Sequence, residues 1–423
     1  MIKFENSFII LKNKSQYLIF EIKDLKDKSS DLQNGRKYIK LKYYGKNKPE
    51  LVPDDSILFV SGSSDDYMDD TIITSSFGNN INLEPSIILN NNDGSNMNRF
   101  YFKEANIING PLDIIGPHSR DVSETLEIIE FDDALNIELK TYYSIFSDSD
   151  VIACKRKIVN NGKNYLDITR LCSIELPILS RDVTINTYDG SWIYERTRHS
   201  THLTSGLFKN GSIVGSSSHR HNPFIEIIDN TNNELYAFNL IYSGNHSEIL
   251  EVNPVGHSKV MIGINDVGFN YRLDKNEEFI TPEAIFVKTD SFDEITREMH
   301  DFCRNHVVNP NFKNQLRPII FNSWEGSFFD IDEKSIVEMA EVSSELGIEQ
   351  FVMDDGWFKG RVNDYAALGD WFVDENKFPN GLGNLADKVR ATGMKFGIWV
   401  EPEMISPISN LYTSHPDWAI KHP

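Results

Sequence analysis

The chain has 423 residues, which is too long for one ordinary domain and predicts two or three. With 40% hydrophobic residues it can bury a sizeable core, and no apolar run is long enough for a membrane-spanning helix. The formal charge of −21 argues against nucleic acid as a partner, because phosphate binding needs a basic surface.

The N-terminus and the cysteines indicate a cytoplasmic protein. The first residues, MIKFENSFIILKNK, lack the continuous apolar stretch and small-residue cleavage site of a signal peptide. Cys154, Cys172 and Cys303 are odd in number, far apart and not spaced as metal ligands. We therefore expect buried thiols, no disulfide framework, no metal and no cofactor.

Residues 1–288 have the pattern of many short strands. Apolar and polar residues alternate at three places: Ile137 and Leu139, Ile152 and Cys154, and Leu166 and Ile168. Asn-Asn-Gly at 160–162 predicts a tight reversal with positive φ between the last two strands. Loops are expected at 90–96 and 229–233. Many strands without long helical patterns predict a β-sandwich of two broad sheets.

A helical linker is expected over 289–316. Ser291 and Glu294 form a capping box, with a hydroxyl at the cap and a carboxylate three residues later. Behind this box one helical face collects apolar residues and a histidine: Ile295, Met299, Phe302 and His306. The helix should end before Pro310.

From residue 317 to 423 the pattern becomes strand, helix, strand, helix, strand. The strands are 318–321, 348–353 and 396–400, and apolar residues on both faces predict parallel strands covered by helices. The first helix presents Ile336, Met339, Ser343 and Leu346 on one face and ends at Gly347. The second contains Leu385 and Val389 and ends at Gly393.

The position of the polar residues favours the beginning of a (β/α) barrel over a doubly wound sheet. Tryptophans and carboxylates follow the strands at their C-terminal ends, where a barrel builds its active site. No glycine-rich phosphate loop follows a strand, which counts against a nucleotide-binding sheet.

The residues after the strands have the chemistry of a sugar pocket. They are Trp324 and Glu325, Asp354, Asp355 and Trp357, Asp370 and Trp371, and Trp399, Glu401 and Glu403. Indole rings cover the apolar face of a sugar, and carboxylates accept hydrogen bonds from its hydroxyls. Each tryptophan could instead pack beneath a loop, but their gathering at strand ends favours sugar binding.

The adjacent Asp354 and Asp355 are poor candidates for a catalytic pair. A retaining glycosidase needs two carboxyl groups about 5 Å apart on opposite sides of the scissile bond. Neighbouring residues on a strand point to opposite faces, and a turn would aim both at one side of the sugar. Holding two hydroxyls is the better role. For Glu401 and Glu403, a catalytic role and a structural role remain open.

These runs resemble glycoside hydrolase family 36 α-galactosidases. The similar segments in the second part are FNSWE (321–325), FVMDDGWF (351–358), LGDWFVDENKFPNGL (368–382), FGIWVEPEM (396–404) and HPDW (415–418). In the first part they are SWIYERTRH (191–199), SSSHRHNPFI (216–225), YSGN (242–245), GIN (263–265) and TPE (281–283). The resemblance implies an N-terminal β-supersandwich (1–288), the linker (289–316) and the first three βα units of an incomplete (β/α)8 TIM-type barrel (317–423).

The resemblance also implies roles for four residues. Asp354 and Asp355 should bind galactose hydroxyls, and Trp399 should line the same subsite. Trp192 should reach the active site of a neighbouring subunit in a homotetramer; the alternative is a core tryptophan of the sandwich. The implied partner is a galactoside sugar of the melibiose or raffinose type.

The family's catalytic motifs are not among these residues. Its nucleophile belongs to a Lys-Trp-Asp-x-Asn motif on a later strand, and its acid/base aspartate follows on another; both are expected beyond Pro423, as is a C-terminal β-domain. We therefore expect this chain to be inactive by itself, and the isolated segment 317–423 to be poorly stable because its sheet has an open edge.

Other functions remain open beside retaining α-galactosidase. Two are enzymes of similar sequence, an α-N-acetylgalactosaminidase and a plant-type raffinose-forming transferase. The third is a non-catalytic galactose-binding or assembly protein that uses the sandwich alone.

Overall fold

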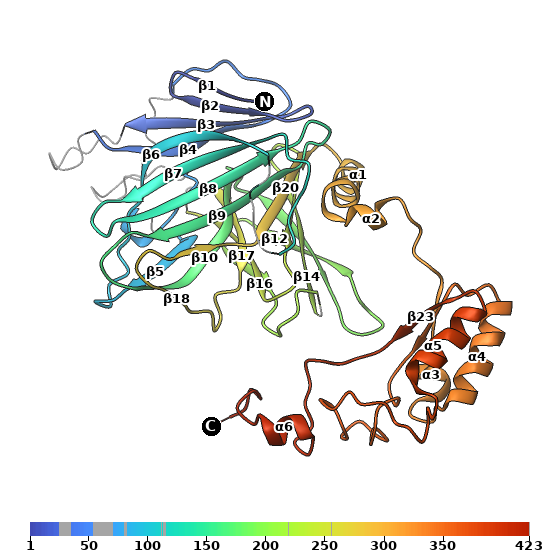
Figure 1. Ribbon diagram of the computed structural model, residues 1–423. Coiled ribbons are helices and arrows are strands. Elements are labelled where there is room, and N and C mark those ends of the chain that lie inside the picture. Colours follow the sequence, from blue (N-terminus) through green and yellow to red (C-terminus); the bar gives the residue numbers. More distant parts are fainter. Residues whose placement is uncertain are drawn as a thin grey trace. The chain divides into compact units, whose positions relative to one another are not determined.

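The computed structural model describes residues 1–24, 35–53, 71–79, 83–110, 112, 116–218, 220–254 and 256–422. They form two units, Met1–Lys313 and Asn314–Pro423, each with its own hydrophobic core (Figure 1). The division lies within the stretch assigned above to a linker. Of the helices in these ranges, none is long and apolar enough to cross a membrane.

Antiparallel sheets form unit 1, as the alternating pattern predicts. Among the described residues the larger sheet has 14 strands in the order β1 (Ile2–Glu5), β2 (Phe8–Lys12), β3 (Tyr17–Asp24), β4 (Lys37–Gly45), β6 (Tyr101–Asn109), β7 (Glu124–Asp132), β8 (Ile137–Ile145), β9 (Ile152–Asn160), β20 (Glu283–Thr289), β15 (Glu234–Ile241), β14 (His221–Asp229), β11 (Val183–Asp189) and β12 (Thr197–Leu203), with β19 (Glu278–Ile280) beside β9. The six described strands of the smaller sheet run β13 (Gly206–Gly211), β16 (His246–Val252), β17 (Ser258–Ile264), β10 (Leu166–Pro177) and β18 (Tyr271–Leu273), with β5 (Ile87–Asn91) beside β10.

The main core of unit 1 is built from both sheets. Leu126, Tyr143 and Phe286 of the larger sheet belong to one buried cluster with Leu176 and Val260 of the smaller sheet. Burial of each such side chain stabilises the fold by roughly 1.5–3 kcal/mol. Packing between the inner faces of two sheets is what defines a sandwich.

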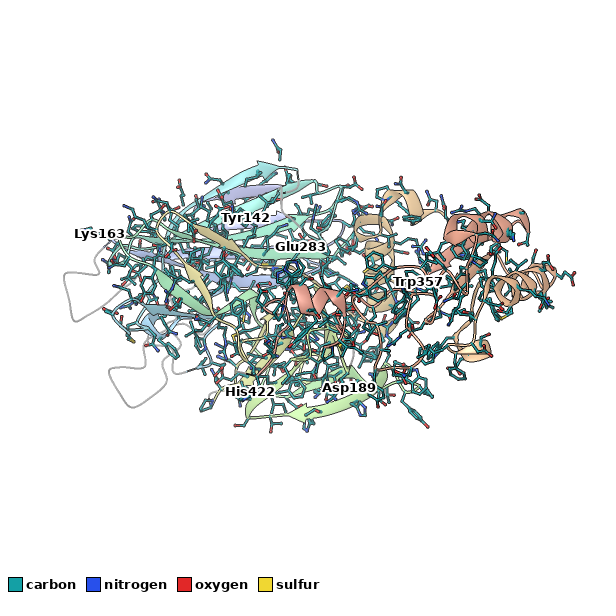
Figure 2. The ribbon with its side chains drawn as sticks, turned by 60° about the horizontal axis from the view of Figure 1, so that its bottom comes forward. Tyr142, Lys163, Asp189, Glu283, Trp357 and His422 are labelled. Atoms are coloured by element: carbon teal, nitrogen blue, oxygen red, sulfur yellow. The ribbon has the colours of Figure 1, made fainter. Side chains whose placement is uncertain are left out.

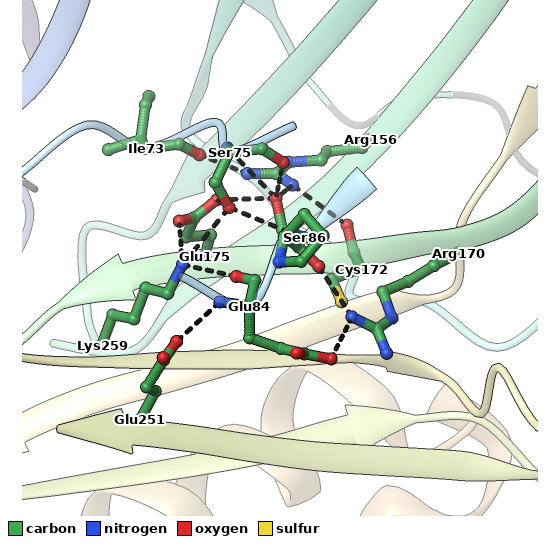
Figure 3. A network of polar contacts seen from close by, with 11 residues as sticks. Ile73, Ser75, Glu84, Ser86, Arg156, Arg170, Cys172, Glu175, Glu251 and Lys259 are labelled. Carbon is green, nitrogen blue, oxygen red and sulfur yellow. Dashed lines mark hydrogen bonds and ion pairs between the residues drawn. The ribbon is translucent and has the colours of Figure 1, made fainter. Parts of the chain in front are cut away.

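A buried polar network ties an irregular segment of unit 1 to two strands (Figure 3). The backbone N–H and the hydroxyl of Ser75 both donate to Glu175 Oε2 of β10 at 2.8 Å, and the Ser86 hydroxyl donates to the same oxygen at 2.6 Å. The fully buried Arg156 of β9 donates to Ser86 Oγ at 2.9 Å. Because buried charges must be hydrogen-bonded, these contacts fix the segment.

The turn at 160–162 differs from its prediction. It does not connect a hairpin, because β9 pairs with β8, β20 and β19 while β10 pairs with strands of the smaller sheet. Gly162 is needed for space and not for positive φ: a Cβ there would lie 2.7 Å from the Leu135 carbonyl oxygen. Asn160 Nδ2 donates to the carbonyl oxygens of Asn164 and Leu273 at 2.9 and 3.0 Å. The turn thus passes the chain from one sheet to the other.

Of the two predicted loops, one is confirmed and one is shifted. Residues 230–233 join β14 to β15 as a turn. Residues 90 and 91 instead end β5, because their backbone pairs with β10. A short 3-10 turn, η2 (Phe77–Asn79), lies between β4 and β5.

The linker helix begins and packs as predicted. In α1 (Phe292–Phe302) the Ser291 hydroxyl accepts the Glu294 N–H at 3.2 Å, while the Glu294 carboxylate accepts from Asp290 N–H. Its predicted apolar face is buried: Ile295, Met299 and Phe302, followed by His306 in the π-helical turn η3 (Cys303–Val307). A separate short helix, α2 (Pro310–Lys313), follows.

Unit 2 has a three-stranded parallel sheet among its described residues, in the order β21 (Ile320–Asn322), β22 (Gln350–Met353) and β23 (Lys395–Ile398). Its helices are α3 (Trp324–Ser327), α4 (Glu333–Glu345), α5 (Gly381–Ala391) and α6 (Asn410–Ser414). Ile336 of α4 and Leu385 and Val389 of α5 are buried with Phe351 and Met353 of β22. The helices α4 and α5 lie side by side (Figure 1).

Two details of unit 2 contradict the predictions. Leu346, expected on the buried face of α4, is 78% exposed, because it lies beyond the last helical residue. The strands are also not covered on both faces: Ile320 and Ile398, in the two outer strands, are 54% and 39% exposed. The predicted helix ends at Gly347 and Gly393 both have positive φ, of 85° and 92°.

Candidate functional site

Asp354 follows β22 directly and is held by the end of β21. Its backbone N–H donates to Ser323 Oγ at 3.0 Å, and its Oδ2 accepts from Asn322 Nδ2 at 2.5 Å. Its Oδ1 accepts the backbone N–H of Asp355 at 2.7 Å. The parallel register of the two strands therefore fixes both the backbone and the carboxylate of Asp354.

Asp355 is bound by Arg361, which lies in the loop after β22. Arg361 Nε donates to Oδ1 and Oδ2 at 2.9 and 3.1 Å, and Nη2 donates to Oδ2 at 2.7 Å. Arg361 Nη1 also donates to the Ala366 carbonyl oxygen at 2.8 Å, and the Gly356 N–H donates to Asp355 Oδ1 at 2.6 Å. Both charged side chains are buried, and the bidentate geometry is the strong form of such a pair.

Three of the tryptophans lie together beside these aspartates. Trp357 is a core residue, and its Nε1 donates to the Trp399 carbonyl oxygen at 2.9 Å. Trp371 is close to both, with ring centroids 6.3 Å from Trp357 and 6.2 Å from Trp399. Trp399 N–H donates to the carbonyl oxygen of Met353, the residue before Asp354. Trp371 and Trp399 are only partly buried, so their rings keep some exposed surface.

The remaining acceptor sites suggest unequal roles for the two aspartates. An ionised carboxylate has about four lone-pair directions. Asp354 uses two of them within the chain, whereas Asp355 uses at least three. Asp354 can therefore accept from roughly two ligand hydroxyls and Asp355 from about one. Hydrogen-bond acceptors next to a partly exposed indole ring are suited to a polyol ligand.

Trp192 is not a core residue, so that alternative is wrong. It lies in the loop between β11 and β12 and is 80% exposed. Its neighbours Ile193 and Tyr194 are also exposed. The loop belongs to unit 1, whereas Asp354, Asp355 and Trp399 belong to unit 2. In the quoted run 216–225, His219 lies outside the described residues.

Two other residues that follow the strands, Trp324 and Asp370, make contacts outside this group. Trp324 packs against Phe328 and Phe329, with ring centroids 5.1 Å away in each case. Asp370 accepts the backbone N–H groups of Asn410 and Leu411 at 2.7 and 3.1 Å, so it caps the start of α6. Neither residue is placed here as a sugar ligand.

Sequence reasoning missed Arg361 and Asn322 as parts of the site. A usable signal for Arg361 exists: two consecutive aspartates after a buried strand need a counter-charge, and Arg361 is the first arginine after them. Asn322 gave no comparable signal, because its role depends on which residue the neighbouring strand places beside it.

Comparisons with known proteins support one family. A family model described as "Glycosyl hydrolase family 36 N-terminal domain" matches residues 37–274, and one described as "Melibiase" matches residues 278–423. Alpha-galactosidase Mel36A of Lactobacillus acidophilus is 37% identical over 349 residues, which cover 80% of this chain and 48% of that protein. Alpha-galactosidase AgaA of Geobacillus stearothermophilus is 35% identical over 358 residues, 82% of this chain and 49% of that protein. The chain thus spans about half the length of these relatives.

Solved structures are similar over nearly the whole chain. GH36 alpha-galactosidase AgaB of Geobacillus stearothermophilus has a TM-score of 0.90 at 30% identity, covering 100% of this chain and 60% of that one. A variant of AgaA in complex with stachyose has a TM-score of 0.88 at 31% identity, covering 98% of this chain and 59% of that one. Another AgaA variant was solved in complex with raffinose.

Proposed function

The chain belongs to glycoside hydrolase family 36, and on this premise we propose that it is the N-terminal part of a retaining α-galactosidase. The observation that carries this proposal is the Asp354–Asp355 pair at the end of β22 beside the partly exposed Trp399. The proposed substrates are terminal α-galactosides of the melibiose and raffinose type. Relatives in complex with raffinose and stachyose support this substrate class.

Asp354, Asp355 and Trp399 would form the galactose subsite. We infer that Asp354 accepts from two sugar hydroxyls and Asp355 from one, with Arg361 fixing the second carboxylate. In this proposal β21, β22 and β23, with the helices between them, are the first units of a (β/α)8 barrel. The proposed boundaries are 1–288 for the sandwich, 289–316 for the linker and 317–423 for the barrel part.

We do not assign the nucleophile or the acid/base, the two residues that break the glycosidic bond, to any of residues 1–423. The nucleophile and the acid/base aspartate would belong to later strands of the complete protein. Residues 1–423 alone would then hold the sandwich and part of the galactose subsite without hydrolysing the substrate. We further propose that the complete enzyme is a cytoplasmic homotetramer in which Trp192 reaches a neighbouring subunit's site; its 80% exposure supports this.

The test is hydrolysis of melibiose by the protein translated from the complete reading frame that contains this sequence. We expect release of galactose, first as the α-anomer, because a retaining mechanism passes through two inversions. Release of the β-anomer first would contradict retention, and no release would contradict the α-galactosidase assignment. The 423-residue chain, assayed alongside, should release none.

A further inference from the structure

A small pocket, separate from the Asp354–Asp355 site, lies in unit 1 where three turns meet. Its cavity volume is about 270 Å3. The turns are the one after β5, the one between β7 and β8, and the one between β9 and β10. Lys163, at the centre of the last turn, lies at one end of the sandwich (Figure 2). The lining residues are Asn91, Asn92, Ala134, Leu135, Asn136, Ile137, Asn160, Gly162, Lys163, Asn164, Tyr165 and Leu166.

Three asparagines fix the frame of this pocket. Asn160 is buried, and its amide donates to the carbonyl oxygens of Asn164, in the same turn, and of Leu273, the last residue of β18. Asn136 Nδ2 donates to the Asn161 carbonyl oxygen at 2.6 Å, which joins the β7–β8 turn to the β9–β10 turn. Asn91 Nδ2 donates to Ser95 Oγ at 3.0 Å and closes the turn after β5. The walls are therefore preformed and do not depend on a ligand.

Four other polar groups that line the pocket are available to bind a ligand. The side chains of Asn92, Lys163 and Asn164 are exposed and, within the described part of the chain, have no hydrogen-bond partner; the same holds for the Tyr165 hydroxyl. The Tyr165 ring has the Arg272 guanidinium 4.0 Å from its centroid, which holds the ring in place. The pocket thus offers amide donors, amide acceptors, one ammonium group and one phenol on a fixed frame.

We propose that this pocket binds a single sugar ring of a neutral saccharide, separately from the Asp354–Asp355 site. Amides and a phenol pair with hydroxyls as both donors and acceptors, which suits a polyol. No carboxylate lines the pocket and Lys163 repels cations, so a metal ion does not fit. The volume lies just below the range of about 300–1,000 Å3 for drug-sized ligands, which limits the ligand to one ring. The proposal does not rest on the catalytic function.

The test is saturation-transfer NMR on the 423-residue chain with D-galactose and with D-glucose. We expect saturation transfer with a Kd on the order of millimolar, as few polar contacts on a small ligand give. The double variant Asn92→Ala/Asn164→Ala should raise this Kd at least tenfold. Both side chains are exposed and unbound in the chain, so the fold should survive; the two single variants replace the double variant if its circular dichroism changes.

Matched variants separate this pocket from other sites. Asn311→Ala/Asn376→Ala removes two exposed asparagines outside the pocket and should leave the Kd unchanged. Absence of saturation transfer, or an unchanged Kd in the double variant, would each overturn the proposal. Displacement of galactose by an equal concentration of inorganic phosphate would identify an anion site and overturn it as well.

Discussion

Replacing Glu130 with glutamine should make unit 1 more stable at neutral and alkaline pH. Glu130 is buried in β7, and its Oε2 accepts from the Thr74 hydroxyl at 2.5 Å. Burial raises the pKa of this carboxyl from 4.5 to about 7, although Thr74 and the charge of Arg156 oppose the shift. Glutamine keeps the shape and an acceptor for Thr74, but it never has to be ionised inside the protein.

The magnitude follows from the two pKa values. Between pH 4.5 and about 7 the folded state holds a proton on Glu130 that the unfolded state has released. The free energy of unfolding therefore falls as the pH rises through this window and is constant above it. At about 1.4 kcal/mol per pKa unit, the loss is on the order of 3 kcal/mol. The variant lacks this loss.

Urea unfolding of wild type and Glu130→Gln at several pH values between 4.5 and 8 measures the difference directly. We expect the two curves to separate as the pH rises, with the variant about 3 kcal/mol more stable at pH 8. Glu104→Gln, an exposed position on β6, is the matched control and should follow wild type. A constant difference across this range would refute the reasoning, because it would mean that Glu130 does not titrate there.

Three further predictions concern other charges and the exposed loop. Arg361→Leu should weaken unit 2 by several kcal/mol, because the Asp355 carboxylate stays buried without its partner; amide hydrogen exchange in β22 should rise, and unchanged exchange would contradict this. For His246, burial lowers the pKa, but the hydrogen bond and the charge of Glu248 raise it, and the net shift is upward. Glu248→Gln should therefore lower the pKa of His246, which titration of the ring protons by NMR measures. An unchanged pKa would contradict this. Trp192→Ala should leave the melting temperature of the 423-residue chain within about 1 °C, since the side chain is exposed, and a large decrease would show that it packs within the chain.

The sequence correctly predicted the strands and helix ends that are marked by local patterns. The period-two alternation around Ile137 and Ile152 located β8 and β9, and the hydroxyl and carboxylate at Ser291 and Glu294 located the start of α1. Gly347 marked the end of a helix because a positive φ is required there. These features depend on neighbours within a few residues, which a single sequence displays.

Features that depend on residues far apart in the sequence could not be predicted from local patterns. β20 pairs with β9 and β15, although long stretches of chain separate it from β9. Glu130 and Arg156 look like solvent-facing strand residues, yet both are buried, because register alone decides which face they occupy. The Arg361–Asp355 pair was missed for a different reason: the two residues are only six positions apart, but a loop conformation, and not a spacing rule, brings them together.

The central claim is that Asp354 and Asp355 hold the galactose of the substrate. The most direct test is kcat/KM of the complete protein on 4-nitrophenyl α-galactoside for Asp354→Asn against Glu345→Gln, an exposed carboxylate at the end of α4. We predict a loss on the order of a hundredfold for Asp354→Asn, since charged hydrogen bonds to two hydroxyls are removed, and less than a threefold change for Glu345→Gln. Equal kcat/KM values for Asp354→Asn and wild type would contradict the account.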